Sequence, residues 1–219
     1  MHRWFLWCGV IAGPIYVILA GTQAVTRDGF ELTRHPISLL SNGDFGWVQI
    51  LNFVIAGVLV NAAALGLRGT ITSGPGHIWG PILIGIYGVG LIGSGVFVAD
   101  PQDGFPPGTP AGDPVDATFS GAMHFMAGGI AFLALIIACF VFARRFAWFG
   151  ESTWTYASVA TGVIFFVGFA STAATGGAAA ANVLLTFAVI LGWAWLAGLS
   201  LRVLAGTEEP GGERVAYGG

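Results

Sequence analysis

The sequence is poor in charged residues, which make up 9% of its 219 residues. Soluble domains carry about 25% charged residues. Hydrophobic residues make up 55% of the chain, and the mean hydropathy is +0.80. This balance predicts that lipid surrounds most of the chain. The formal net charge of −3 provides no basic surface for phosphates, so we expect no nucleic-acid partner.

Lysine is absent, because all 8 basic residues are arginine. This absence excludes a lysine Schiff base, and with it a retinal protein or a pyridoxal enzyme. The 2 cysteines, Cys8 and Cys139, both lie in apolar stretches, which predicts buried thiols and not a disulfide framework. Short zinc-binding spacings of histidine are also missing, and one histidine well inside an apolar stretch does not suffice for a bis-histidine haem.

Six long stretches contain no Asp, Glu, Lys or Arg. They cover residues 5–24, 48–67, 78–98, 119–143, 153–174 and 183–201. Each can cross a hydrocarbon core of about 30 Å as a helix, which satisfies its own backbone hydrogen bonds in lipid. We therefore predict an all-α, polytopic bundle of six transmembrane helices over residues 1–205. We expect residues 206–219 to form a disordered cytoplasmic tail.

The arginines predict how the bundle is oriented. Six of the 8 arginines fall on one side of the six-span arrangement, and only Arg27 and Arg34 fall on the other. The positive-inside rule then places both termini in the cytoplasm of a multi-pass cell-membrane protein. Two long connections, at residues 26–44 and 100–116, would lie on the outer side.

These two outer connections are unusual in composition. The first mixes charged residues with apolar anchors, and we expect it to pack on the bundle with a short interfacial helix over residues 36–41, opened by Pro36. The second is acidic and rich in proline and glycine, which predicts an irregular but stiff loop. It places Asp100 and Asp103 at the membrane boundary.

His124 lies inside the span at 119–143, near its outer end. Ionisable residues within spans are rare and usually face the protein interior or a water-filled cavity. Ser120 lies one turn earlier on the same face, and Asn52 lies at a similar depth. Further polar residues gather in or just beyond the outer halves of the spans: Gln23, Ser94, Ser171, Thr172, Thr175, Asn182 and Thr186. The outer half is therefore predicted to hold a polar pocket, and the inner half to be packed.

Four motifs occur in a fixed order: RDGF from Arg27, HPISLLS from His35, GWVQILNF from Gly46 and VADPQDGFP from Val98, followed by His124 early in the fourth span. This set resembles the bacterial and archaeal membrane family known as domain of unknown function 998. The resemblance covers the first four spans by motif and the last two by hydropathy. It implies a six-helix bundle, draws attention to the outer-loop residues, and supplies no activity.

The first functional hypothesis is an enzyme that acts by acid–base chemistry on a lipid-like or prenyl-like substrate. The candidate catalytic residues are Asp100, Asp103, His124 and Ser120. The candidate substrate-binding residues are Asp28, Arg34, His35, Ser38 and Asn52. A metal-assisted variant uses His35, His124, Asp100 and Asp103 as ligands of a divalent metal. The expected partners are membrane lipid and a small apolar or amphipathic ligand.

Two other classes of function stay open. A transporter of a small solute or proton would use the same pocket, although no charged residue lies deep in the inner half of the spans. A non-catalytic partner or sensor subunit would bind another protein through the outer loops, and His124 would then only hydrogen-bond a neighbouring helix. An apolar cavity that opens sideways near Asp100 and His124 favours the enzyme. A continuous path favours the transporter, and a solid outer half favours the partner.

Overall fold

A computed structural model describes residues 3–112 and 116–206. The helices are α1 (Arg3–Thr26), the 3-10 helix η1 (Ile37–Ser41), α2 (Gly46–Thr70), α3 (Trp79–Val96), α4 (Phe119–Trp148), α5 (Ser152–Thr175) and α6 (Ala179–Leu204). Six of them are long and apolar enough to cross a membrane, so the predicted six-span fold is confirmed. The tail predicted at residues 206–219 lies outside the described residues apart from Gly206.

The helix boundaries differ from the predicted ones most in α4 and α6, and α6 begins at Ala179, four residues before the predicted start. Helix α3 ends at Val96, two residues before the predicted limit, because the chain turns to an extended conformation at Phe97. Helix α4 continues to Trp148, so that Arg144 and Arg145 belong to its last two turns. The Arg145 guanidinium donates to the carbonyl oxygens of the α2–α3 connection, which anchors this longer helix end.

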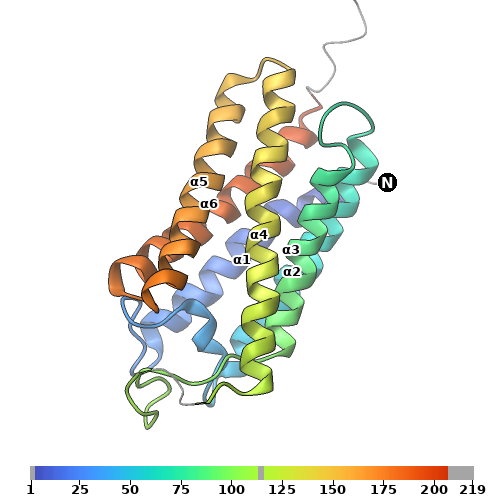
Figure 1. The fold of residues 1–219 in the computed structure, drawn as a ribbon. Helices are drawn as coiled ribbons and strands as arrows, with labels where there is room; N and C mark the ends of the chain where they lie inside the picture. The colour runs from blue at the N-terminus through green and yellow to red at the C-terminus, as the bar shows by residue number, and fades with distance from the viewer. Residues whose placement is uncertain (1–2, 113–115, 207–219) are drawn as a thin grey trace, which may run out of the picture.

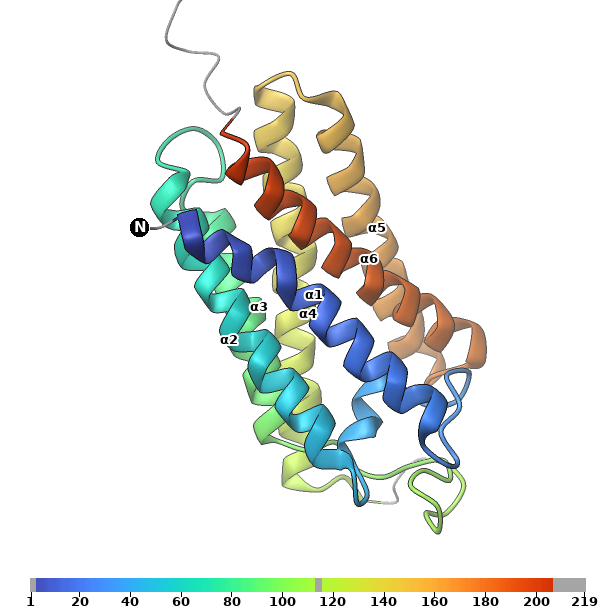
Figure 2. The same ribbon diagram turned by 180° about the vertical axis from the view of Figure 1, so that it is seen from behind.

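The six transmembrane helices form a ring in chain order, because each packs against the next and α1 also packs against α6 (Figures 1 and 2). Both described chain ends lie at one end of the bundle, where the Arg3 side chain donates to the Leu204 carbonyl. We call this the terminal end. The opposite end, which carries residues 27–45, 97–112 and 116–118, is called the loop end. The cytoplasmic position of the terminal end remains a prediction from the arginines.

The two halves of the bundle are packed differently. In the terminal half the large side chains of Leu6, Leu67, Phe142, Phe146 and Leu199 are at most 1% exposed. Helices α4 and α5 lie close together at their short connection and diverge toward the loop end (Figure 1). The loop-end half is therefore wider on the side of these two helices.

The loop end has a small apolar core of its own. It is formed by Phe30, Leu39, Leu40, Ala99 and Phe105, which come from both long connections. The short helix expected at residues 36–41 is present as η1, one residue shorter than expected. The two connections thus pack onto the bundle and cover the loop end of its interior. We call residues 27–45 and 97–112 the roof.

Candidate functional site

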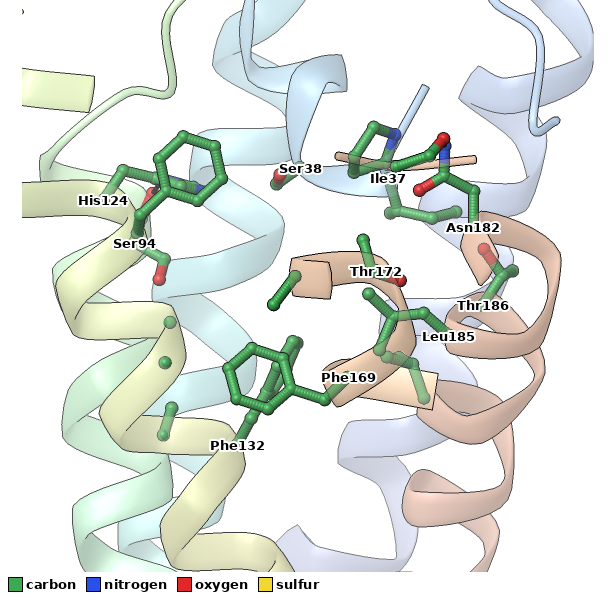
Figure 3. A pocket seen from close by; sticks show the side chains of 18 of the residues that line it. Ile37, Ser38, Ser94, His124, Phe132, Phe169, Thr172, Asn182, Leu185 and Thr186 are labelled. Carbon is green, nitrogen blue, oxygen red and sulfur yellow. Dashed lines mark hydrogen bonds between the residues drawn. The ribbon is translucent and has the colours of Figure 1, made fainter. Parts of the chain in front are cut away.

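A cavity of ≈ 430 Å³ lies in the loop-end half of the bundle and is lined by side chains from all six transmembrane helices and from η1. His124 and Asn182 lie on opposite sides of this cavity (Figure 3). Ile37 of η1 lies at its loop end, and Phe132 and Phe169 lie at the other end (Figure 3). The cavity is therefore polar near the roof and apolar toward the middle of the bundle.

The cavity reaches the outside of the bundle between α4 and α5. The exposed residues among its lining are Ala117 and Phe125 at the start of α4, and Ala173 and Gly176 at the end of α5. Phe125 is 56% exposed. Because the two helices diverge here, this side of the cavity faces the surrounding membrane.

His124 connects α4 to the end of α3. Its Nδ1 atom lies 3.0 Å from the Ser94 carbonyl oxygen and 2.8 Å from the Phe97 carbonyl oxygen. Both partners are acceptors, so Nδ1 carries the hydrogen and donates it. In the neutral imidazole Nε2 is then an acceptor, and no described residue donates to it. His124 lines the cavity while it is only 4% exposed.

Two further buried side chains in the lining have a polar atom without a described partner. Asn182 donates from Nδ2 to the carbonyl oxygens of Arg34 and Gly177, at 3.1 and 2.8 Å, which leaves Oδ1 unpaired. Trp193 packs on the Tyr16 ring and has no described partner at Nε1. A buried polar atom without a hydrogen bond costs about 1–3 kcal/mol. Both atoms are positions where a bound molecule would complete the hydrogen bonding.

Asp100 borders the cavity but also stabilises the start of α4. Its carboxylate accepts from the Thr118 backbone N–H at 2.9 Å and from the Thr118 hydroxyl at 2.5 Å. Thr118 is the N-cap of α4 and accepts from the Gly121 N–H. A carboxylate at a helix N-terminus is favourable, and Gly121 is needed because a Cβ there would collide with Asp100. Asp100 thus acts as a capping group.

Asp103 forms an ion pair that joins the two long connections. The Arg34 guanidinium donates to both carboxylate oxygens, at 3.2 and 3.1 Å, and the Gly112 N–H donates to Oδ1. The hydrogen bonds from Arg34 and then from Gly112 lower the pKa of the Asp103 carboxyl. The same pair raises the pKa of Arg34. Asp103 is therefore ionised at neutral pH, accepts hydrogen bonds only, and does not line the cavity.

His35 joins the same two connections from inside the loop-end core. Its Nδ1 accepts from the Glu31 N–H at 2.9 Å, and its Nε2 lies 3.0 Å from the Asp103 carbonyl oxygen. The ring is 1% exposed and contacts the rings of Phe30 and Phe105. Both ring nitrogens are thus engaged in holding the roof, and His35 is absent from the described cavity lining.

The remaining predicted residues lie in different surroundings. Ser38 lines the cavity, whereas Asp28 is exposed. The Ser120 hydroxyl donates to the Val98 carbonyl, and the Asn52 amide donates to the Tyr16 carbonyl within a buried network between α1 and α2. Within residues 3–112 and 116–206, no group of three or more His, Cys, Asp or Glu is placed to hold a metal ion. The four residues considered as metal ligands therefore do not form one group.

Several residues of the cavity lining were not among the site residues predicted from the sequence. Asn182 and Thr186 belong to the predicted polar set of the outer half but were not assigned a role. Phe132, Phe169 and Trp193 could not be distinguished from other aromatic residues, because a lipid-facing and a cavity-facing aromatic residue give the same pattern in an apolar span. Periodicity carries no signal here, since both surroundings are apolar.

Fold and cavity together define a multi-pass helical membrane protein with an internal cavity whose lining includes exposed residues next to α4 and α5. The chain belongs to the family described as Protein of unknown function (DUF998), which matches residues 10–202. This match confirms the family resemblance based on the ordered motifs. No curated protein and no solved structure matches the chain. Its function must therefore be argued from the cavity.

Proposed function

We propose that this protein binds a lipid-like amphipathic molecule in the loop-end cavity. The polar head would lie below η1, between His124 and Asn182. The apolar chain would extend toward Phe132 and Phe169 and reach the membrane between α4 and α5. The observation that carries this proposal is the cavity itself, which is polar at one end, apolar at the other, and open on the membrane side.

The dimensions and chemistry of the cavity support this assignment. Sites for small molecules usually measure about 300–1,000 Å³ and combine an apolar lining with a few convergent polar groups. The cavity of ≈ 430 Å³ falls in this range. A ligand that already lies in the membrane would need no passage through water, because the opening faces lipid.

A more specific proposal is that the protein performs acid–base chemistry on the bound head group. Of the four candidate catalytic residues, His124 is the one best placed for this role. Asp103 and Ser120 use their polar atoms for other contacts and lie outside the described cavity lining. Asp100 has both oxygens engaged by Thr118. His124 has a fixed tautomer with an accepting Nε2 on the cavity, which is the arrangement a general base requires. Incubation with a membrane lipid extract should yield a product, seen by mass spectrometry, that a His124→Asn protein does not form.

The packing of the terminal half supports a binding site over a transport path. The described lining of the cavity comes from the loop-end half and the middle of the bundle, and the fully buried Leu6, Leu67 and Phe142 fill the space beyond. A transporter would need a second arrangement in which these side chains separate. A protein that only binds a partner through its outer loops would need no internal cavity.

A steric block tests the proposal. Gly128 lines the cavity, and an added Cβ would meet only Ser94 Oγ, at an ordinary distance of 3.5 Å. Gly128→Leu should therefore fill part of the cavity without a backbone clash. Gly21→Leu is the matched control, because Gly21 is exposed on α1 with nothing within 4 Å of such a Cβ.

The probe is tritiated farnesol, a long-chain alcohol, added to the purified protein in detergent micelles. We expect saturable binding to the wild-type and Gly21→Leu proteins, and a loss of about tenfold or more in affinity in Gly128→Leu. Equal binding to all three folded proteins would mean that the probe binds to the outer surface and would overturn the proposal.

A further inference from the structure

The polar groups at the loop end of the cavity are mainly hydrogen-bond acceptors. Nε2 of His124 and Oδ1 of Asn182 have no described donor. Their orientation is fixed because Nδ1 of His124 and Nδ2 of Asn182 donate to backbone carbonyls. The Asp100 carboxylate borders the same space. Oδ1 of Asn182 belongs to a side chain that is only 2% exposed, so water reaches it poorly.

The other polar side chains of the lining do not change this balance. Six of these side chains carry hydroxyls and one carries an amide, and each of these groups can donate or accept: Tyr16, Ser38, Tyr87, Ser94, Thr172, Thr186 and Gln102. The N–H of Trp193 is a fixed donor, but it lies about 16 Å further along α6 than Asn182, at the rise of a helix. The head of a ligand below η1 would therefore meet fixed acceptors and adaptable hydroxyls.

Among the described residues, no positively charged side chain lines this end of the cavity. The chain has no lysine, and among the residues that the structure describes no arginine lines the cavity. The two loop-end arginines have other partners. Arg27 donates to the carbonyls of Leu40 and Asn42 and lies over the Phe105 ring, and Arg34 is paired with Asp103.

The start of α6 does not replace the missing cation. The N–H groups of Ala181 and Asn182 both donate to the Ala178 carbonyl, so they are engaged within the helix. The two residues before them, Ala179 and Ala180, are absent from the described cavity lining. The start of α4 is occupied by the Asp100 carboxylate. The two helix N-termini near the cavity therefore offer little to an anion, although helix N-termini often bind phosphate.

We infer that the cavity selects a ligand whose head donates hydrogen bonds and carries no negative charge, namely the hydroxyl of a long-chain alcohol and not a phosphate ester. This inference rests on the proposed function and names the substrate class of the same site. A phosphate monoester carries about −1.5 to −2 charges at neutral pH. Desolvating that charge beside Asp100 without a counter-charge is strongly unfavourable. A ligand hydroxyl can donate to Nε2 of His124 or to Oδ1 of Asn182, and it can accept from the Ser94 hydroxyl.

The test compares two ligands with the same chain, farnesol and farnesyl phosphate, in competition with tritiated farnesol at neutral pH. Specific binding is defined as the difference between binding to the wild-type protein and binding to the Gly128→Leu protein at the same ligand concentration. We expect the alcohol to bind the wild-type protein about tenfold or more tighter than the phosphate. Ser38→Arg adds a cation at the half-buried roof position and should raise the affinity for the phosphate relative to that for the alcohol.

The outcomes separate the inference from the proposed function. Equal or tighter specific binding of the phosphate to the wild-type protein would overturn the inference and leave a lipid-binding cavity in place. Absence of specific binding of either compound to folded protein would overturn both. The ratio of the affinities of the wild-type protein for farnesol and farnesyl phosphate is sufficient for the test. The test therefore remains valid if the Ser38→Arg protein does not fold.

Discussion

The Nδ1 atom of His124 lies 2.8 Å from the carbonyl oxygen of Phe97, the residue directly after α3. This contact gives the histidine two roles. Its donated hydrogen bond satisfies a carbonyl at a helix end, which otherwise has no partner within the helix. The same contact fixes the tautomer, so that Nε2 accepts hydrogen bonds from the cavity.

Two substitutions should separate these roles. His124→Asn keeps an N–H near the position of Nδ1 but removes Nε2, so we expect stability within about 1 kcal/mol of wild type and a loss of farnesol binding of about tenfold or more. His124→Ala removes both groups and should also destabilise the protein by about 1–3 kcal/mol. The measurements are unfolding in mixed micelles and ligand binding. Normal farnesol binding by a folded His124→Asn protein would leave the histidine a structural role only.

The capping role of Asp100 predicts a loss of stability when its carboxylate is replaced. Asp100→Asn replaces one accepting oxygen with an NH₂ group, which cannot accept from Thr118. We expect a loss of about 1–3 kcal/mol in the free energy of unfolding, measured in the same micelles. Asp116→Asn is the control, since Asp116 is exposed in the same connection and should change little. An unchanged stability of Asp100→Asn would show that the cap is not needed.

The Arg34–Asp103 pair predicts a pH dependence confined to acid. Its hydrogen bonds lower the pKa of Asp103 in the folded protein, so the pair stabilises the protein above the carboxyl's ordinary pKa of about 3.9. That contribution is lost as the pH falls through the lower folded-state pKa. Because both side chains are partly exposed, the effect is small.

Asp103→Asn tests this dependence. The difference in thermal midpoint between the wild-type and Asp103→Asn proteins should be present at neutral pH and vanish in acid, below both pKa values of the carboxyl. Asp28→Asn, which changes an exposed carboxylate in the other long connection, is the control. A difference that persists unchanged into acid would indicate that the ion pair does not stabilise the roof.

The six spans and their order were predictable, because a span is a property of composition along the chain and needs no knowledge of its neighbours. The interior position of His124 followed from the high cost of an ionisable group in lipid. The apolar anchors of the first outer connection correctly predicted that it packs on the bundle, but the role of His35 did not follow. A histidine with two backbone partners and a histidine with a free nitrogen look alike in sequence.

The grouping of the site residues could not be predicted for a related reason. Asp100 and Asp103 are three residues apart in an acidic loop and received the same role, yet one caps α4 and the other pairs with Arg34. Which partner each carboxylate finds depends on how the two connections cross over the bundle. Hydrophobic periodicity records which side of a helix is apolar and carries no information about such crossings.

Photo-cross-linking tests the central claim most directly. A long-chain alcohol that carries a diazirine at its far end is bound to the protein, and the complex is irradiated. Mass spectrometry then locates the modified residues. We predict adducts on the cavity residues Phe132, Phe169 and Leu185, suppressed by excess farnesol. Adducts confined to the outward face of α5, for example at Phe166, and unaffected by farnesol would contradict a ligand site inside the bundle.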